Sequence, residues 1–559
     1  MLTFALLLTA AFYFRVSVAR FLPNDAPFDG KVYAQMARNV LEQHVYSHAT
    51  EPPYDPSLIR LPGYPLFLAG IYTVFGHGDN TPVRITQALI DTASCGLIAL
   101  LAFYWEPEEK LKRRSAIAAL ALAAACPFST IYVATILTET PTIFFAVAMC
   151  LTATFAFRES DQKRAALWWL ATGVVCGVAV LFRPDSGLFA AAIGITLVAT
   201  TLKGSAHSQE PQPAKDFLFR FSRASFLGAV FSLAFCLVLV PWTIRNQRVF
   251  HLFQPLAPAH AEMPGEFVPR GYLAWLRTWI DDGRYIGPVL WALDDAPIKI
   301  SDIPERAFDS AEEKQRVAVL FDKYNHPPEA QSQSSPSPAD NQTAEQDQSS
   351  GNTNDNSNDN TDEADAGNQN DEDNSNSNDE ADEGDQTDEN AAADQTSDQA
   401  VEMTPEIDAG FAQIAAERRA RHPIRSYLFL PFKRGLSLWF DTHSQYYPFE
   451  GELLPLGDLD YDIHQQYWLP LFAGLTFLYT LLGVTGGWFL WNSGLFAARR
   501  WLLLAALMVF LRVGFFATLE NPEPRYVVEV FPFLSVLGGI ALVRLGRTAR
   551  TRRKQLSSN

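Results

Sequence analysis

The sequence has 559 residues, of which 48% are hydrophobic, and a formal net charge of −18. That average combines two compositions, because the segment 331–400 holds 20 acidic residues and no lysine or arginine. Without this segment the net charge is +2, so the acidic balance excludes no class of substrate. A polar segment of such high charge buries too little apolar surface to offset chain entropy, and we expect it to be disordered.

Long apolar runs recur outside this insert. A helix crosses a bilayer core of roughly 30 Å with about 20 residues. We expect about ten such spans, at residues 2–19, 84–105, 115–132, 141–157, 165–181, 188–202, 224–244, 467–491, 501–518 and 527–543. The first run is interpreted as a retained helix, because no small-residue cleavage site of a signal peptide follows it. The expected fold is an all-α polytopic membrane protein.

Lysine and arginine gather in alternate loops between these spans. They lie at 106–114, 158–164, 203–223 and 498–500, and in the tail 544–555. Basic loops resist translocation and so mark the cytoplasmic side. We therefore expect a multi-pass protein of the cell membrane, the inner membrane in a bacterium, with both termini in the cytoplasm.

This topology predicts the organisation of the chain. The expected parts are a transmembrane core at 1–246 with a first outer loop at 22–83, outer-face helical regions at 247–330 and 401–466, the acidic insert 331–400, C-terminal helices at 467–543 and a basic cytoplasmic tail at 544–559. The outer face, or periplasm, would then carry the first loop and the region before the last three helices.

Polar residues concentrate at the expected outer ends of the spans, where charge near hydrocarbon is usually functional or snorkelling. Asp29 could take a proton from a hydroxyl nucleophile or hold a divalent cation, and it could equally cap a helix. Arg525 suits a phosphate group, and its alternative is an interfacial anchor beside Tyr526. Glu139 is interpreted either as a site residue or as part of a helix cap.

Six motifs together resemble a known family. They are "FDGKVYAQMA" at 28–37, "RLPGYPLFLAGIYTVFG" at 60–76, "TETPTIFF" at 138–145, "LFRPD" at 181–185, "PWTIRN" at 241–246 and "EPRYVVEVFPFL" at 523–534. In this order they resemble the bacterial branch of the family 39 membrane glycosyltransferases of the GT-C superfamily. These enzymes are similar to dolichyl-phosphate-mannose protein mannosyltransferases and to lipid A aminoarabinose transferases.

The resemblance implies a hexosyl- or pentosyltransferase that moves a sugar, with inversion, from a polyprenyl-phosphate donor to an outer-face acceptor. It implies Asp29 as the catalytic residue, and as substrate-binding residues Tyr33, Arg60, Tyr64, Glu139, Arg183, Arg245, Arg525 and Tyr526. The expected partners are the lipid-linked donor, membrane lipid and an acceptor that is a protein, lipid A or a glycan, with no nucleic acid.

The motifs also depart from the family pattern. Relatives carry an acidic pair where this chain has Asp29-Gly30, and a second carboxylate is absent near Ile59-Arg60. No metal ligand is therefore assigned, and a divalent cation stays an open alternative.

Two other function classes stay open at this stage. One is a transporter or flippase of polyprenyl lipids, and the other is a non-catalytic membrane scaffold that binds partners through the acidic insert. For the outer-region tryptophans Trp275, Trp279 and Trp439, packing or interfacial anchoring is favoured over stacking on a sugar.

Overall fold

A computed structural model describes residues 2–22, 28–203, 213–281, 283–327, 401–440 and 463–556. Every regular element within these ranges is helical, as the composition predicts. The expected disorder of the insert 331–400 concerns residues outside the described ranges.

Eight helical segments of the described chain are long and apolar enough to cross a membrane. They correspond to α1 (Leu2–Phe21), α4 (Thr81–Trp105), α7 (Glu139–Arg158), α8 (Gln162–Phe182), η2 (Pro184–Ser186) with α9 (Gly187–Lys203), α10 (Pro213–Phe250), α15 (Ile463–Asn492), and η9 (Pro524–Val530) with α17 (Phe531–Leu556). A bent pair gives a ninth span, formed by α5 (Lys112–Ala124) and α6 (Pro127–Thr130) with η1 (Ile131–Val133).

The tenth expected span is helix α16 (Phe496–Phe516), which falls outside this apolar set and contains Arg499, Arg500 and Arg512. All ten expected segments are thus helical, and the chain is a multi-pass membrane protein.

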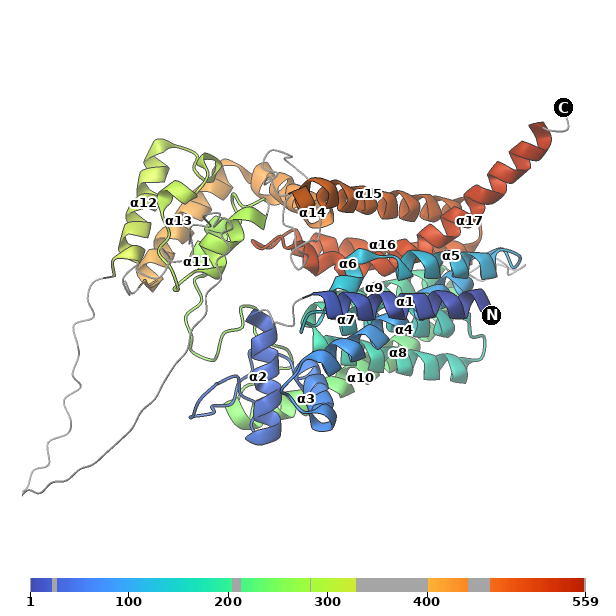
Figure 1. Ribbon diagram of the computed structural model, residues 1–559, viewed down its shortest axis with the longest axis horizontal. Helices are drawn as coiled ribbons and strands as arrows, with labels where there is room; N and C mark the ends of the chain where they lie inside the picture. Colours follow the sequence, from blue (N-terminus) through green and yellow to red (C-terminus); the bar gives the residue numbers. More distant parts are fainter. Residues whose placement is uncertain are drawn as a thin grey trace, which may run out of the picture.

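The helices run along one long bundle with two distinct ends (Figure 1). Both termini lie at one end, here called the terminal end, where Arg544 donates to Glu106 at 2.5 Å and Arg500 donates to the Phe157 carbonyl at 3.1 Å. The opposite end, here called the loop end, carries α2 (Phe28–Glu42), α3 (Gly63–Phe75) and the helices of the region 270–440. The basic loops therefore share the end that holds the termini.

The bent span is held by a buried arginine. Its two parts meet at 52°, at the point where Pro127 cannot continue the helical hydrogen bonds of α5. Arg15 of α1 donates to the carbonyls of Ala123 and Ala124 at this break, and it pairs with Asp91 at 2.6 Å. Arg15 thus satisfies a helix end inside the bundle, which explains a charge in the middle of an apolar helix.

The outer region at the loop end has a core of its own. It is built from α11 (Arg270–Leu276), η3 (Gly283–Tyr285), η4 (Gly287–Trp291), η5 (Ile300–Asp302), η6 (Glu305–Ala307), α12 (Ala311–Asn325), α13 (Pro405–Arg421), η8 (Arg425–Phe429) and α14 (Leu430–Phe440). Trp275 and Trp279 are fully buried in this core, where they pack against each other and against Phe411 and Tyr285. Both tryptophans therefore have a packing role, and neither is exposed to a sugar.

Close packing between α15 and α17 depends on glycine. A Cβ atom on Gly486 would lie 2.0 Å from the carbonyl oxygen of Leu537, a backbone atom that cannot move aside. Small residues allow such close approach between membrane helices.

Gly486→Ala is expected to destabilise the protein by about 1–3 kcal/mol, the usual effect of overpacking. The matched control is Gly474→Ala in the same helix, where an added Cβ meets no atom within 4 Å. Thermal unfolding in detergent should therefore show a lower midpoint for the first variant only. Equal midpoints for the two variants would contradict this packing.

Candidate active site

Asp29 lies at the loop end between two arginines that are distant in the sequence. It sits in the first turn of α2, and its Oδ1 accepts a hydrogen bond from Arg60 Nη2 at 3.0 Å. Its Oδ2 accepts one from Arg525 Nη2 at 3.3 Å. Arg60 is held by the loop before α3, and Arg525 by η9 before α17. All three side chains are partly buried, and each oxygen of Asp29 faces one guanidinium group.

Arg525 also contacts a second carboxylate. Its Nε lies 2.7 Å from Glu523 Oε1. Burial raises the pKa of Glu523, and the charge of Arg525 opposes that shift. We name Asp29, Arg60, Glu523 and Arg525 the Asp29 cluster. It combines a partly exposed carboxylate, a deeply buried one and two arginines.

A second set of charges lies deeper and is nearly closed to solvent. Arg183 contacts Glu139 at 2.7 Å, Asp185 at 3.2 Å and Glu529 at 3.5 Å. Arg512 contacts Asp185 at 3.1 Å and Glu529 at 2.9 Å. These five residues, here called the buried network, set three carboxylates against two guanidinium groups. Such an arrangement is rigid, because each charge away from water needs its partners.

Tyr526 joins the two sets. Its ring centroid lies 5.3 Å from the guanidinium carbon of Arg525 and 5.5 Å from that of Arg183. The ring also stacks on Phe516 of α16. The aromatic ring therefore contacts one cation of the Asp29 cluster and one of the buried network.

Tyr33, one turn after Asp29 on α2, packs against Tyr64 of α3. Burial raises the pKa of Tyr33 to about 12, so its hydroxyl stays protonated at neutral pH and can donate a hydrogen bond. Its ring meets the edge of Tyr64 at a centroid distance of 5.2 Å. Tyr64 is fully buried and donates to Gln87 Oε1 at 2.8 Å. Tyr33 is thus at the site, whereas Tyr64 supports it from inside the protein.

Arg245 lies apart from both charge sets. It donates to the carbonyl of Ser57 at 2.8 Å, and its guanidinium packs over the rings of Tyr46 and Trp242. These contacts hold the loop that leads to Arg60. Arg245 therefore contacts the loop that leads to Arg60 and does not contact Asp29 itself. The structure brings together Asp29, Arg60 and Arg525.

Three residues of the buried network, Asp185, Arg512 and Glu529, are absent from the site residues predicted from the motifs. Asp185 and Glu529 lie inside the motifs "LFRPD" and "EPRYVVEVFPFL", and Arg512 lies inside the expected span 501–518. The signal was present, because an acidic residue inside a membrane helix needs a partner and usually marks a functional region.

The donor groups around Asp29 do not suit a metal ion. Each of its oxygens faces a guanidinium group, which would repel a cation. Among the described residues, no three or more His, Cys, Asp or Glu side chains are grouped so that they could hold a metal. The chemistry of this site is therefore derived from its own side chains.

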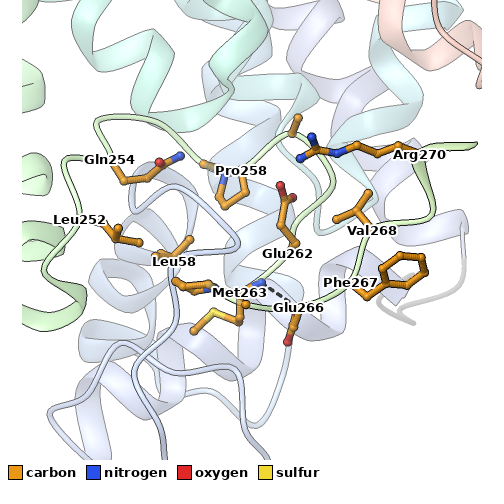
Figure 2. A pocket seen from close by; sticks show the side chains of 14 residues that line it. Leu58, Leu252, Gln254, Pro258, Glu262, Met263, Glu266, Phe267, Val268 and Arg270 are labelled. Atoms are coloured by element: carbon orange, nitrogen blue, oxygen red, sulfur yellow. Dashed lines mark hydrogen bonds between the residues drawn. The ribbon is translucent and has the colours of Figure 1, made fainter. Parts of the chain in front are cut away.

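A cavity of about 690 Å³ opens beside the loop that carries Arg60. Figure 2 shows it between Leu58 and the segment that follows α10, with the Met263 N–H donating to Glu266 at its wall. Polar lining comes from Gln254, Glu262, Glu266 and Arg270. None of the Asp29 cluster lines this cavity, although Leu58 is only two positions from Arg60.

Comparisons with known proteins match the chain to a family model and to solved structures. Residues 55–213 match the family model described as dolichyl-phosphate-mannose-protein mannosyltransferase. A crystal structure of ArnT from Cupriavidus metallidurans bound to undecaprenyl phosphate is similar at 12% identity, covering 97% of this chain and 77% of that one. Its TM-score of 0.35 is too low for the likeness to carry an argument about function. Among curated proteins, none matches the sequence.

Proposed function

We propose, from the match of residues 55–213 to the family model described as dolichyl-phosphate-mannose-protein mannosyltransferase, that this chain is a membrane glycosyltransferase with a polyprenyl-phosphate sugar as its donor. One observation carries the proposal. A carboxylate and two arginines, drawn from α2, the loop before α3 and η9, meet at the loop end of a membrane bundle. This combination suits a reaction in which a phosphate leaves and a hydroxyl loses a proton.

The arginines suit the leaving group. A guanidinium carries five N–H donors in a fixed fork, so one arginine can bind a phosphate while it contacts a carboxylate. As the bond between the sugar C1 and the phosphate oxygen breaks, its electron pair stays on that oxygen, and Arg60 and Arg525 stabilise the added negative charge.

Asp29 suits the acceptor, the second substrate of the reaction. The acceptor hydroxyl attacks C1 of the sugar from the face opposite the phosphate. The configuration at C1 is therefore inverted in the product. The proton of that hydroxyl passes to Asp29, which acts as the general base. Tyr33, one turn after Asp29 on α2, stays protonated and would donate a hydrogen bond to the sugar.

The orientation of the bundle follows from its charges. The basic loops and the tail share the terminal end, which we assign to the cytoplasm. The membrane that the bundle crosses would be the inner membrane of a bacterial cell. The Asp29 cluster then faces the periplasm, where nucleotide sugars are absent and a lipid-linked donor supplies the sugar.

Arg525→Lys tests the phosphate contact. Lysine keeps the positive charge and loses the fork, so the affinity for a polyprenyl phosphate should fall about 10–100-fold, the usual effect of losing a hydrogen bond to a charged group. Binding is measured by native mass spectrometry of the purified protein in nanodiscs.

The matched control is Arg270→Lys, an exposed arginine at the same end of the bundle and outside the Asp29 cluster. Its affinity should equal that of the wild type. An unchanged affinity in folded Arg525→Lys would remove Arg525 from the phosphate site.

A further inference from the structure

The segment η8–α14 carries an unusual exposed surface. Ile424, just before η8, is 73% exposed, Tyr427 and Leu428 are each 67% exposed, and Phe429 and Phe432 are 54% and 64% exposed. We name these five side chains the apolar face. Contiguous apolar surface of this kind on a protein marks an interaction site.

Basic side chains of the same segment bind inward, to the outer region. Arg425 donates to the carbonyl of Arg306 at 3.1 Å, and Lys433 pairs with Asp281 at 2.6 Å. Arg434 is buried and donates to the carbonyls of Ile280 at 2.7 Å and Arg277 at 2.5 Å. The polar side of the helix is thus fixed to the protein, and this leaves the apolar face outward.

The end of α14 lies at the depth of a membrane span. Trp439 Nε1 donates to Thr480 Oγ1 at 2.8 Å, and Phe440 stacks on Phe477 with centroids 4.7 Å apart. Both partners belong to the apolar span Pro470–Asn492 of α15. Thr480 lies ten residues into this span, which corresponds to roughly 15 Å along a helix. A helix that reaches so far down α15 is at the level of lipid.

The apolar face also continues the lipid-facing surface of its neighbours. On α15, Phe477 and Leu481 are 50% and 65% exposed, and on α16, Phe510 is 71% exposed. Figure 1 shows α14 beside the loop ends of α15 and α16, between these spans and α11–α13. Around spans that cross a membrane, such surfaces are covered by acyl chains.

We propose that the apolar face of η8–α14 is seated in the lipid of the leaflet at the loop end, so that this segment anchors the outer region to the bilayer. The opposite side of α14 packs against the chain that leads to the candidate site, because Leu438 clusters with Phe516 and Val527. The anchor therefore fixes the depth of the segment that carries Arg525 and Tyr526. The lipid contact itself does not depend on the proposed reaction.

Lipid-depth quenching tests this contact directly. In a Cys236→Ser background, which removes the exposed cysteine, Leu428→Cys is labelled with a fluorophore and the full chain is placed in nanodiscs. Interfacial helices bury their apolar face about 5–10 Å into the headgroup–acyl boundary, so lipids with a nitroxide at that depth should lower the emission about twofold. Val319→Cys on α12 is the matched control, 52% exposed and outside the apolar face, and its emission should not change.

The outcome is decisive in either direction. Quenching at Leu428 and none at Val319 would support the lipid contact. An equal loss of emission at the two positions on adding nitroxide lipid would overturn it. A label at Leu428 that is shielded from a water-soluble quencher, yet untouched by nitroxide lipid, would assign the face to a second copy or another protein and would also overturn the proposal.

Discussion

Asp29→Asn is expected to lower the rate of sugar transfer by about 10²–10⁴-fold, the usual contribution of a general base. Asparagine keeps the shape of the side chain and one acceptor oxygen, so it can still accept a hydrogen bond from one of the two arginines, but it cannot accept the proton of the acceptor. The loss should therefore appear in kcat, with little change in the affinity for the donor. Transfer is measured with purified protein under saturating donor.

Asp55→Asn is the matched control, because Asp55 is an exposed aspartate of the same loop. It should retain wild-type activity. Both variants should show wild-type thermal unfolding, since neither removes a fully buried charge. Full activity in Asp29→Asn would exclude Asp29 as the base.

Arg512→Met is expected to destabilise the protein by about 3–5 kcal/mol, the usual result of removing one partner of a buried ion pair. Arg512 is completely buried, and it also donates to the carbonyl of Tyr526 at 2.6 Å. Methionine would leave Asp185 and Glu529 facing one another with Arg183 as their remaining cation. The measurement is the unfolding midpoint in detergent.

Glu529→Gln supplies the comparison for this prediction. The buried network has one carboxylate more than it has arginines, so a neutral group at Glu529 balances the charge. Its amide oxygen can take the place of Glu529 Oε1, which lies 3.5 Å from Arg183 and 2.9 Å from Arg512. We expect a small change in stability, and a loss as large as that of Arg512→Met would contradict the charge count.

Much of the fold could be predicted from the sequence. Apolar run length placed the ten helical segments, because the hydrocarbon core sets one length for every span. The alternation of basic loops predicts that α1 begins and α17 ends at the same end of the bundle, and Figure 1 shows this. The resemblance drawn from the motifs is confirmed by the family match over residues 55–213.

The site was predictable only in part. The motifs singled out Asp29, Arg60 and Arg525, but no spacing could show that a residue of α2 meets one 496 positions later. The pairing of Arg512 with Glu529 and Asp185 depends on how α16, η9 and η2 pack together. Side-chain partners across a bundle are set by tertiary packing, which the one-dimensional pattern does not contain.

The bend of the third span was missed for a similar reason. The run 115–132 reads as one helix by its apolar composition, and Pro127 was the available signal of a break. Arg15 from another helix stabilises the break by donating to the carbonyls of Ala123 and Ala124, at the end of α5.

The most direct test of the central claim is transfer of radiolabelled sugar from a panel of synthetic polyprenyl phosphate sugars by the purified wild-type protein, run beside Asp29→Asn and beside nucleotide sugars. The account predicts that label leaves a polyprenyl phosphate donor with the wild type only, that nucleotide sugars stay intact, and that a chelator has no effect. Specific binding of these lipids without turnover, together with their movement across vesicle membranes, would contradict it and identify a transporter.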